Sequence, residues 1–328
     1  MKTRIAPLVV LLALALPAVL SRAASDATVK LSKTQDRVRV EIGGQLFTEY
    51  IFKGGPVPYL YPVLAPDGTA LTRDFPMKKV DGEEQDHTHH RSLWFTHGAV
   101  NGVDFWQDVP KRGFVVNEAV SFAIEKGVGI VRARNKWEGP DKALHCTDET
   151  TIQFRATPNG RLIDYEVTIK APADKPVVLG DTKEGSMAVR VAQWLTPTHR
   201  FAGKDSVGST GTLVNDAGAK NDAVWSKKST WIDNFGTKDG KVYGIAIFDH
   251  SKNLRYPTWW HARTYGLLAA NPFGQHDFEP AHKANPNAGD VTIPAGGSLT
   301  FRWRVYVHTG DTAAAKVAEQ YAAYAAGK

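Results

Sequence analysis

Short segments of alternating apolar and polar residues constrain the fold of this 328-residue chain more than any other feature. From Ala27 onward, segments such as RVRVEI, TTIQFRAT and RLIDYEVTIKA alternate with a period of two, and Gly, Asn, Asp or Pro turns separate them. Successive side chains of a strand point to opposite faces, so this period is typical of half-buried antiparallel strands. The chain has no G-x-G-x-x-G after a strand and no alternating strand and helix rhythm. We therefore predict an all-β fold, a large antiparallel two-sheet β-sandwich.

The end of the chain is the one segment that reads as a helix. Asp311–Lys328 is rich in Ala, and Val317, Tyr321 and Tyr324 form an apolar stripe at helical spacing. Asp311 or Thr312 is a suitable cap for the first turn. We predict a short C-terminal helix lying against the edge of the sandwich.

The N-terminal residues 1–23 have the pattern of a secretory signal peptide. Lys2 and Arg4 precede an apolar run from about Ile5 to Leu20, and small residues follow it. The run is shorter than the ~20 residues that cross a bilayer, so we expect cleavage and no stable membrane insertion afterwards. Residues 24–328 are then expected to form a single domain of a periplasmic or secreted protein. The polar stretch 197–225 is predicted to be a long surface excursion within that domain, with room for a small hairpin, and not a domain boundary.

Charge and cysteine content narrow the class of protein. The formal net charge of +6 falls to +3 without Lys2, Arg4 and Arg22, and the remaining charges are evenly spread. This balance argues against a nucleic-acid partner. Cys146 is the only cysteine, so no internal disulfide can form, and we expect a small buried side chain there.

The stretch 86–106, DHTHHRSLWFTHGAVNGVDFW, gathers more polar and aromatic groups than a sandwich core needs. It holds four of the chain's eleven histidines. A buried imidazole or guanidinium without a partner costs roughly 1 to 3 kcal/mol, so their concentration indicates a functional site. If the segment is extended, His87, His89 and Arg91 line one side of it.

Two later segments have the same character. Residues 181–190 place two carboxylates and a lysine before an alternating strand, and a charged turn is the alternative interpretation. Residues 257–266 put two Trp, a His, an Arg and a Tyr within ten positions, which core packing explains only in part. Convergence would give these polar groups partners, so we predict one concave pocket in which both segments meet the histidine stretch.

These residue types suit a carbohydrate. Tryptophan faces stack on sugar rings, arginine binds oxygens or a carboxylate, and histidine transfers protons near neutral pH. The candidate catalytic residues are His87, His89, His90, His97, Glu184, His261 and Tyr265. The candidate substrate-binding residues are Arg91, Trp94, Asp104, Trp106, Lys183, Arg190, Trp259, Arg263 and Asn271.

A divalent metal is the alternative use of the histidines. His87 and His89 on a strand are spaced to offer two imidazoles to zinc or iron, and His97 or His261 would complete a set. The cupin-type arrangement needs a Glu shortly after the second histidine, and HTHHRSLWFTHG has none. A bound divalent metal therefore stays an alternative, and no other cofactor is expected.

Several segments resemble known families. DHTHHRSLWFTHGAVNGVDFW, DTKEGSMAVRVA, IFDHSKNLRYPTWWHARTYGLLAANPFG and FRWRVYVHTGD resemble the secreted bacterial family called PmoA-like, which accompanies sugar-degrading proteins. Its label implies a methane oxygenase, but that subunit is an integral membrane copper protein, and no spanning segment follows the signal peptide here. The closing IPAGGSLTFRWRVYVHTGD resembles the last strands of galactose-mutarotase-like β-supersandwiches. That resemblance implies a sandwich of supersandwich type, a fold that hosts epimerases, lyases and hydrolases.

We predict a periplasmic carbohydrate-active enzyme, a hydrolase, lyase or epimerase, with His and carboxylate acid–base chemistry. Its partner is a small-molecule carbohydrate, either a sugar or an oxidised sugar derivative. A non-catalytic glycan-binding module is the first alternative, although binding alone has little use for four clustered histidines. A metal-dependent oxygenase, as the family label suggests, is the second.

Overall fold

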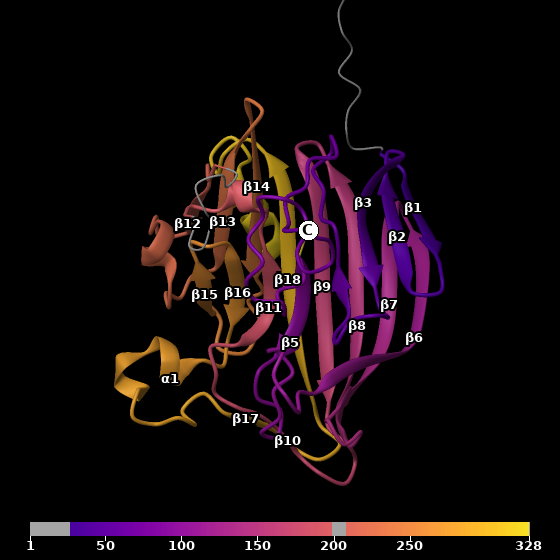
Figure 1. The fold of residues 1–328 in the computed structure, drawn as a ribbon, viewed down its shortest axis with the longest axis vertical. Coiled ribbons are helices and arrows are strands. Elements are labelled where there is room, and N and C mark those ends of the chain that lie inside the picture. The colour runs from indigo at the N-terminus through magenta and orange to yellow at the C-terminus, as the bar shows by residue number, and fades with distance from the viewer. Residues whose placement is uncertain (1–26, 199–207, 328) are drawn as a thin grey trace, which may run out of the picture.

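Two antiparallel sheets of eight strands each form the molecule, which confirms the predicted β-sandwich (Figure 1). The structure is a computed structural model that describes residues 27–198 and 208–327. The predicted signal peptide lies outside the described residues.

The first sheet consists of short strands in the order β1-β2-β3-β4-β5-β11-β16-β15. In chain order these are β1 (Val29–Lys33), β2 (Arg37–Ile42), β3 (Gln45–Ile51), β4 (Tyr59–Leu60), β5 (Leu93–His97), β11 (Gly185–Arg190), β15 (Trp259–Arg263) and β16 (Leu267–Asn271). Strands β5, β11, β16 and β15 are neighbours although they come from distant parts of the sequence. The three segments singled out in the sequence therefore lie side by side.

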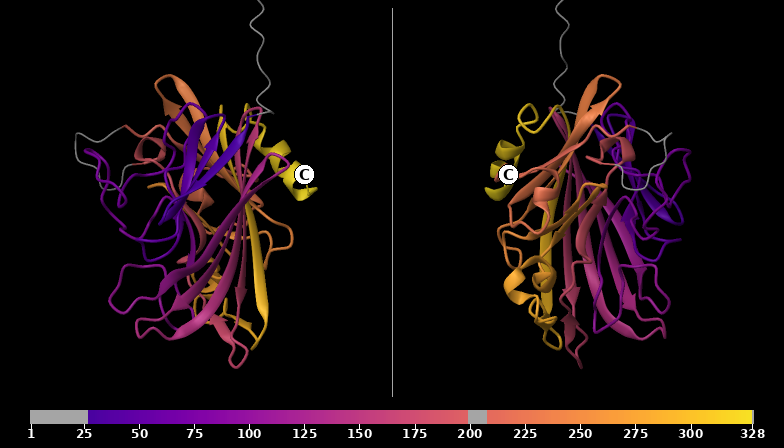
Figure 2. Two further views of the ribbon diagram at one scale, coloured as in Figure 1. Left: turned by 90° about the vertical axis from the view of Figure 1, so that its right-hand side faces the viewer. Right: turned by 60° about the vertical axis from the view of Figure 1, so that its left-hand side comes forward.

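The second sheet consists of longer strands in the order β12-β13-β14-β18-β9-β8-β7-β6 (Figure 2). In chain order these are β6 (Phe114–Glu125), β7 (Val128–Glu138), β8 (Leu144–Thr157), β9 (Gly160–Lys170), β12 (Thr212–Asn215), β13 (Trp231–Lys238), β14 (Lys241–Asp249) and β18 (Ser298–Thr309). Most of these strands pair with a neighbour in sequence across a tight turn, as β8 and β9 do across Pro158–Asn159. A small additional sheet pairs β10 (Val177–Leu179) with β17 (Val291–Ile293).

The core lies between the inner faces of the two large sheets. Phe95 of β5 packs against Trp137, Tyr165 and Trp303 of the second sheet, with ring centroids 5.8 to 6.4 Å apart. Cys146 is buried in this core as a free thiol, as predicted. The inner faces are therefore mainly apolar, and they include a few buried polar side chains that are hydrogen-bonded there.

Helices are few and short in the described residues. They are α1 (Gln275–Phe278) and α2 (Val317–Ala325), with 3-10 turns η2 (Gln193–Leu195), η3 (Asn221–Val224) and η4 (Pro280–His282). Of the helices in residues 27–198 and 208–327, none has the length and apolar character that crossing a bilayer requires.

The C-terminal helix covers a sheet face and not the edge that we predicted. Val317 and Tyr324 pack with Leu162, Phe248 and Tyr306 on the outer face of the second sheet. These outward-facing apolar side chains need cover, and the stripe of α2 supplies it. Asp311 caps the turn that precedes the helix by accepting hydrogen bonds from the next residues.

The predicted surface excursion 197–225 is more ordered than its composition suggests. Strand β12 extends the second sheet by pairing with β13, and η3 leads into Trp225, which is half-buried. Residues 199–207 of the excursion lie outside the described part of the chain. The excursion therefore contributes a strand to the second sheet and a half-buried tryptophan, Trp225.

Candidate functional site

The strand register brings the three predicted segments to one face of the first sheet. A row of directly paired residues crosses four strands: Trp94, Ala188, Ala269 and His261. Paired residues share a face, so Trp94 and His261 point to the same side, and Arg190 and Arg263, two positions further along, join them. Because Phe95 faces the core, this side is the outer face. The site is built there.

Three histidines form a contact cluster over this face. His87 and His90 stack with ring centroids 4.6 Å apart, and His89 meets His90 edge-on at 4.4 Å. The His90 ring stacks on Trp94 at 5.3 Å, and Tyr265 stacks on His87 at 5.1 Å. The first and third predicted segments therefore touch directly.

The backbone of the histidines is a turn and not the extended segment that we expected. His87 has a φ of 45° in the left-handed region, and the N–H of His90 donates to its carbonyl at 2.9 Å. The alternation argument for His87, His89 and Arg91 is therefore wrong, because residues of a turn do not alternate. The turn instead places His87, His89 and His90 in mutual contact.

A buried ion network centred on Asp86 holds this cluster. The Asp86 carboxylate pairs with Arg73, with Arg190 at 2.9 Å and with Nδ1 of His87. Burial opposes its ionisation, but the hydrogen bond from His87 and the two guanidinium charges hold the pKa of Asp86 well below its ordinary value. Arg190 also donates to Nδ1 of His90 at 3.0 Å. Two arginines thus hold the Asp86 carboxylate, the carboxylate holds His87, and Arg190 holds His90.

Hydrogen-bond partners decide which nitrogen of each histidine carries the proton. The Asp86 carboxylate accepts from Nδ1 of His87, so Nε2 is the nitrogen of His87 that can exchange a proton. His90 accepts at Nδ1 and is neutral, because burial and then the charge of Arg190 lower its pKa far below normal. Burial, with the charge of His87, lowers the pKa of His89 to about 4. Of these three, His87 has the carboxylate partner that stabilises an imidazolium.

His261 and Glu184 occupy the adjoining part of the same face. Nδ1 of His261 donates to the carbonyl of Lys183 at 2.7 Å, which leaves the lone pair on Nε2. Burial lowers the pKa of His261 to about 3. Burial also raises the pKa of Glu184, against the ammonium of Lys183 at 3.5 Å. These two groups are therefore biased toward their neutral forms.

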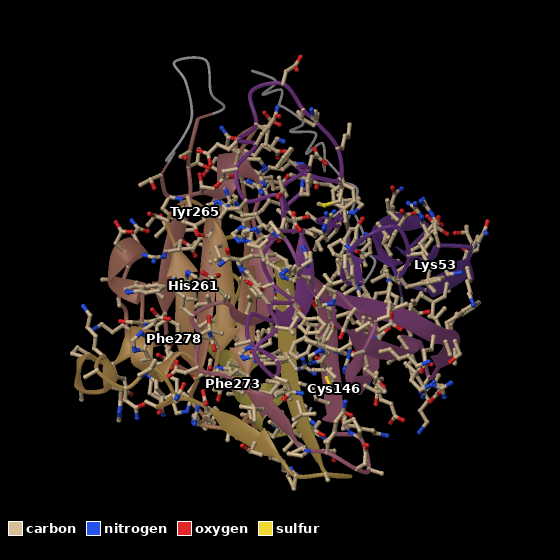
Figure 3. All side chains as sticks on the ribbon, turned by 60° about the horizontal axis from the view of Figure 1, so that its bottom comes forward. Lys53, Cys146, His261, Tyr265, Phe273 and Phe278 are labelled. Carbon is tan, nitrogen blue, oxygen red and sulfur yellow. The ribbon has the colours of Figure 1, made fainter. Side chains whose placement is uncertain are left out.

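Electrostatic influence links the two parts of the site. The charge of His87 contributes to the lowered pKa of His261. Burial raises the pKa of Tyr265, Arg263 opposes the rise, and the negative charge of Glu184 adds to it. Tyr265 stacks on His87 and is also within electrostatic range of Glu184, which links the two parts of the candidate site. His261 and Tyr265 lie on the same side of the molecule (Figure 3).

Trp225 adds an aromatic wall that the sequence did not point to. The guanidinium of Arg263 lies 3.6 Å above the Trp225 ring centroid, and the His261 ring meets Trp225 edge-on at 4.8 Å. Phe278 of α1 packs on Trp225 at 5.2 Å. Among the described residues Arg263 has no hydrogen-bond acceptor and no carboxylate partner. A single tryptophan in an otherwise polar stretch was the one available signal.

His97 does not join the site. It lies an odd number of positions after Trp94 on β5 and therefore points to the opposite, inner face. There its ring lies 4.4 Å from Phe273, its Nε2 donates to the carbonyl of Gly180 at 2.8 Å, and burial lowers its pKa to about 4. The predicted pocket with His97 in it is not what the structure has.

Several predicted substrate-binding residues are buried and hold the candidate site residues in place. Arg190 is 1% exposed and is held by Asp86. Trp94 and Trp106 are equally buried and pack on each other at 5.2 Å. The amide of Asn271 is buried and bonds the carbonyl of Thr182 at 2.8 Å. These four side chains are 0 to 1% exposed, so they position their neighbours.

The remaining predicted residues differ in exposure. Trp259 is buried, and its indole N–H donates to Glu279 at 3.1 Å. Asp104 accepts the backbone N–H of Trp106 at 2.7 Å, as in an Asx turn. Arg91 is half-buried and lies over the ring of Tyr59 at 5.9 Å. Lys183 and Arg91 therefore join Arg263 as cations that a ligand can reach.

The metal hypothesis finds no ligand set in the part of the chain that is described. Within residues 27–198 and 208–327, no three His, Cys, Asp or Glu side chains are arranged to hold a metal ion. His87, His89 and His90 meet ring to ring, and Nδ1 of His90 is occupied by Arg190.

Comparisons with known proteins give a family and distant structural likenesses. The model of a family described as "Family of unknown function (DUF6807)" matches residues 37–322. A search of curated proteins finds no match. The PmoA-like resemblance is not addressed by these comparisons and stays a prediction.

Among solved structures the chain is similar to a galactose mutarotase-like protein from Lactobacillus casei, at 10% identity over 85% of this chain and 100% of that one, with a TM-score of 0.37. It is also similar to a galactose mutarotase related enzyme from Lactobacillus acidophilus, at 10% identity over 86% and 98% of the two chains, with a TM-score of 0.29. An α-galactosidase from Lactobacillus brevis matches at 8% identity over 88% of this chain, with a TM-score of 0.37. This chain spans 40% of the length of that galactosidase.

Proposed function

We propose that this chain, which belongs to the DUF6807 family, is a carbohydrate-active enzyme that moves protons on a sugar or an oxidised sugar derivative. One observation carries the proposal: the outer face of the first sheet joins a histidine–carboxylate pair, a carboxyl of raised pKa and an unpaired guanidinium. These are the pair of Asp86 and His87, then Glu184, then Arg263. A base, an acid and an anion-binding group in one site are the components of proton-transfer catalysis.

His87 is the proposed base. The carboxylate of Asp86 fixes the proton on its Nδ1 and stabilises the imidazolium that forms when Nε2 accepts a proton. Its side chain is 29% exposed, so a substrate can reach it. Arg73 and Arg190 in turn keep Asp86 ionised. Arg73 and Arg190 thus act on His87 through Asp86, because they keep the carboxylate that holds its ring ionised.

Glu184 is the proposed acid. Burial raises the pKa of its carboxyl, so a larger fraction keeps its proton than in an exposed glutamate. Opposite environments for His87 and Glu184 separate the two roles. His261, neutral with a lone pair on Nε2, is placed to accept a hydrogen bond from a sugar hydroxyl.

Arg263 directs the choice of substrate toward an oxidised sugar. Its guanidinium has no acceptor among the described residues and lies over the Trp225 ring, which suits the carbonyl or carboxylate of such a sugar. His87 would then remove the C–H proton next to that group, and the electron pair would move to the oxygen beside Arg263. Reprotonation of the carbon gives epimerisation, and loss of a neighbouring oxygen protonated by Glu184 gives elimination.

A glycan-binding module is the second candidate, and Trp225 with Arg263 is the observation that favours it. An aromatic ring and a free guanidinium hold a sugar without turnover. Such a module has no need of Arg73, Arg190 and Asp86 below the histidines, because burying three charged groups carries a desolvation cost. We therefore place the enzyme first.

The test is a screen of neutral oligosaccharides, uronates and keto-sugars by NMR, with metal analysis of the same sample. We expect turnover of a sugar that carries a carbonyl or carboxylate, lost in His87→Gln. The matched control is His282→Gln, because His282 also pairs with a carboxylate, Glu279 at 3.2 Å, but outside the site. Binding without turnover would establish the module instead, and turnover abolished by a chelator would establish a metal enzyme.

We also propose that the protein acts in the periplasm or outside the cell. The proposal rests on the charged and then apolar pattern of residues 1–23. Cell fractionation with N-terminal sequencing of the mature protein tests it. A protein found in the cytoplasm with Met1 retained would contradict it.

A further inference from the structure

Arg161 differs from the other buried arginines in how its charge is compensated. Five arginines of the described residues are buried: Arg73, Arg112, Arg161, Arg190 and Arg304. Four of them form a salt bridge, to Asp86, Asp108, Asp86 and Asp164 respectively. Arg161 is 3% exposed and has no carboxylate partner in the described part of the chain. A buried cation without a counter-ion is costly, so its surroundings call for an explanation.

Backbone carbonyls accept hydrogen bonds from only some of the N–H groups of Arg161. Nη1 donates to the carbonyls of Leu46 at 3.1 Å and of Leu64 and Ala65 at 3.4 Å, and Nη2 donates to that of Ile42 at 3.5 Å. A guanidinium has five N–H groups, so the Nε–H and one Nη2–H are left without an acceptor among the described residues. Carbonyl dipoles stabilise the cation but do not neutralise it.

The acidic side chain that acts on Arg161, Asp67, has other partners. The charge of Asp67 acts on Arg161, but the Asp67 carboxylate accepts from the hydroxyl of Tyr243 at 2.7 Å and pairs with Lys241 at 3.3 Å. Burial prevails over this influence and lowers the pKa of Arg161 to about 10. The positive charge at Arg161 is therefore in excess.

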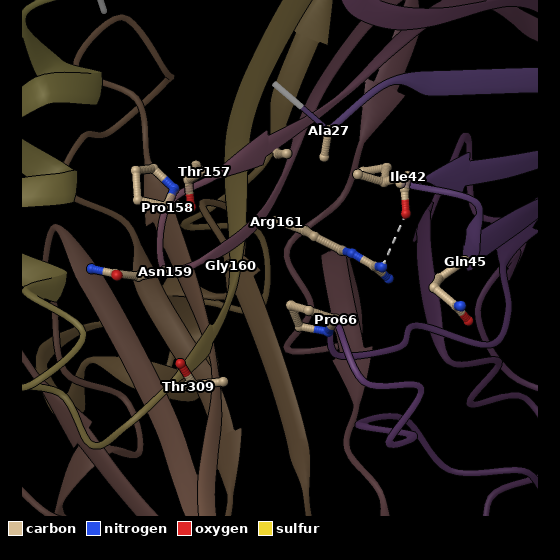
Figure 4. A pocket seen from close by; sticks show the side chains of 12 residues that line it. Ala27, Ile42, Gln45, Pro66, Thr157, Pro158, Asn159, Gly160, Arg161 and Thr309 are labelled. Carbon is tan, nitrogen blue, oxygen red and sulfur yellow. Dashed lines mark hydrogen bonds between the residues drawn. The ribbon is translucent and has the colours of Figure 1, made fainter. Parts of the chain in front are cut away.

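Arg161 lies beside a cavity of about 360 Å³ (Figure 4). Ile42, Pro66 and Pro158 give it apolar walls, and Gln45 and Thr309 add polar groups. The lining comes from Ala27, the β2–β3 turn, the loop that follows β4, the β8–β9 hairpin and the end of β18, and it includes no residue of the candidate site. A volume of this size is at the lower end of the range for small-molecule sites.

We propose that this cavity is a binding site for a small organic carboxylate. The two oxygens of the carboxylate accept the Nε–H and Nη2–H of Arg161, which lie side by side on the guanidinium and match a carboxylate with both oxygens. The short carbon chain packs against Ile42, Pro66 and Pro158. The bound anion supplies the counter-charge that Asp86, Asp108 and Asp164 supply to the other buried arginines.

Occupancy of the site is expected to stabilise the fold. Arg161 belongs to β9 of the second sheet, and the carbonyls that it contacts belong to the first sheet and to the loop that follows β4. Neutralising its charge therefore strengthens a contact between the sheets. A ligand that binds the folded state alone raises the unfolding temperature with its concentration.

The experiment measures thermal unfolding of the full chain in sodium acetate and in sodium propionate, against sodium chloride at equal ionic strength. We expect the carboxylates to raise the unfolding temperature by about 2 °C or more at concentrations above Kd, in a saturable way. Arg161→Gln should abolish the rise. The control Arg132→Gln should retain it, because Arg132 is exposed and paired with Glu125 at 3.1 Å, away from the cavity.

A second variant keeps the contacts of Arg161 to the carbonyls. Gln45→Glu changes an exposed residue of the cavity lining and brings a carboxylate of the chain to the cavity, so the acetate response should weaken while the fold remains. The proposal is overturned if acetate and chloride act alike on the parent protein. It is also overturned if the response persists in Arg161→Gln, or if inorganic phosphate acts and the carboxylates do not.

Discussion

The two faces of the first sheet use histidine differently. His97 on the inner face and His261 on the outer face are both buried, both donate one ring N–H to a backbone carbonyl, and burial lowers the pKa of both. Their neighbours differ: His97 meets Phe273, whereas His261 meets Trp225, on which Arg263 lies. The face of the sheet, and not the residue type, thus decides whether a histidine belongs to a core or to a site.

The second difference between the faces is the network of ion pairs that holds the outer-face residues in place. On the outer face, Arg73 and Arg190 hold Asp86, and Asp86 holds His87. A network of this kind keeps charged groups in fixed positions and protonation states, which catalysis requires. The inner face is ordered mainly by packing, to which His97 adds one hydrogen bond to a backbone carbonyl. Variants of the two faces should therefore separate activity from stability.

The largest effect is expected for Glu184→Gln on the outer face. Loss of a general acid lowers turnover by roughly 10² to 10⁴-fold. Stability should stay the same or rise, because burial disfavours the ionised Glu184 and the glutamine is neutral. Steady-state kinetics with thermal unfolding of the same sample measures both. Unchanged turnover with lost stability would assign Glu184 to structure.

Arg190→Met should show that the outer face depends on its ion network. Removal of one partner from a buried ionic group costs about 3 to 5 kcal/mol of unfolding free energy. The matched variant is Arg263→Met, which removes a half-buried arginine on the same face that has no carboxylate partner. We expect that variant to lose less than about 1 kcal/mol. Equal losses in urea denaturation would contradict the network.

His97→Met tests the inner face in the opposite sense. The side chain contributes packing and one hydrogen bond to the carbonyl of Gly180, so its loss should cost about 1 to 3 kcal/mol. Turnover should stay within about twofold of the parent at a temperature where both are folded. A large loss of turnover at unchanged stability would place His97 in the chemistry after all.

The same variant gives the smallest effect through pH. Burial lowers the folded-state pKa of His97 to about 4, below its ordinary value of about 6.5. Between these values the unfolded chain binds the proton and the folded chain does not, so this part of the stability is complete above pH 6.5 and is lost as pH falls toward 4. The stability advantage of the parent over His97→Met should therefore fall by up to about 1.4 kcal/mol per pH unit in that window and reverse in sign near its acid end. Denaturation at several pH values measures it, and a constant difference would contradict the buried neutral His97.

Local patterns in the sequence predicted the sheets well. TTIQFRAT and RLIDYEVTIKA form the hairpin of β8 and β9, because alternation and a tight turn are sufficient for neighbouring strands. The place of the C-terminal helix was not predictable in the same way. It depends on outward-facing apolar residues such as Phe248 and Tyr306, which become a surface only after the sheet has formed.

The site was predictable in part. The structure brings the segments of His87 and His261 together, because Tyr265 stacks on His87. The shared pocket with Glu184 and the roles of all three residues stay predictions. The contribution of Arg73 and Trp225 depends on tertiary contacts between distant segments, which no local pattern records. The inner position of His97 was available from alternation, since an odd spacing from Trp94 reverses the face.

Proton exchange at carbon is the most direct test of acid–base chemistry at His87. Keto-sugars and uronates are incubated with the protein in D2O, and NMR follows the C–H next to the carbonyl or carboxylate. We expect deuterium at that carbon in substrate or product with the parent protein and with His97→Met, and none with His87→Gln. Exchange that is unaffected in His87→Gln, or its absence for every sugar that the protein binds, would contradict an acid–base site on the outer face of the first sheet.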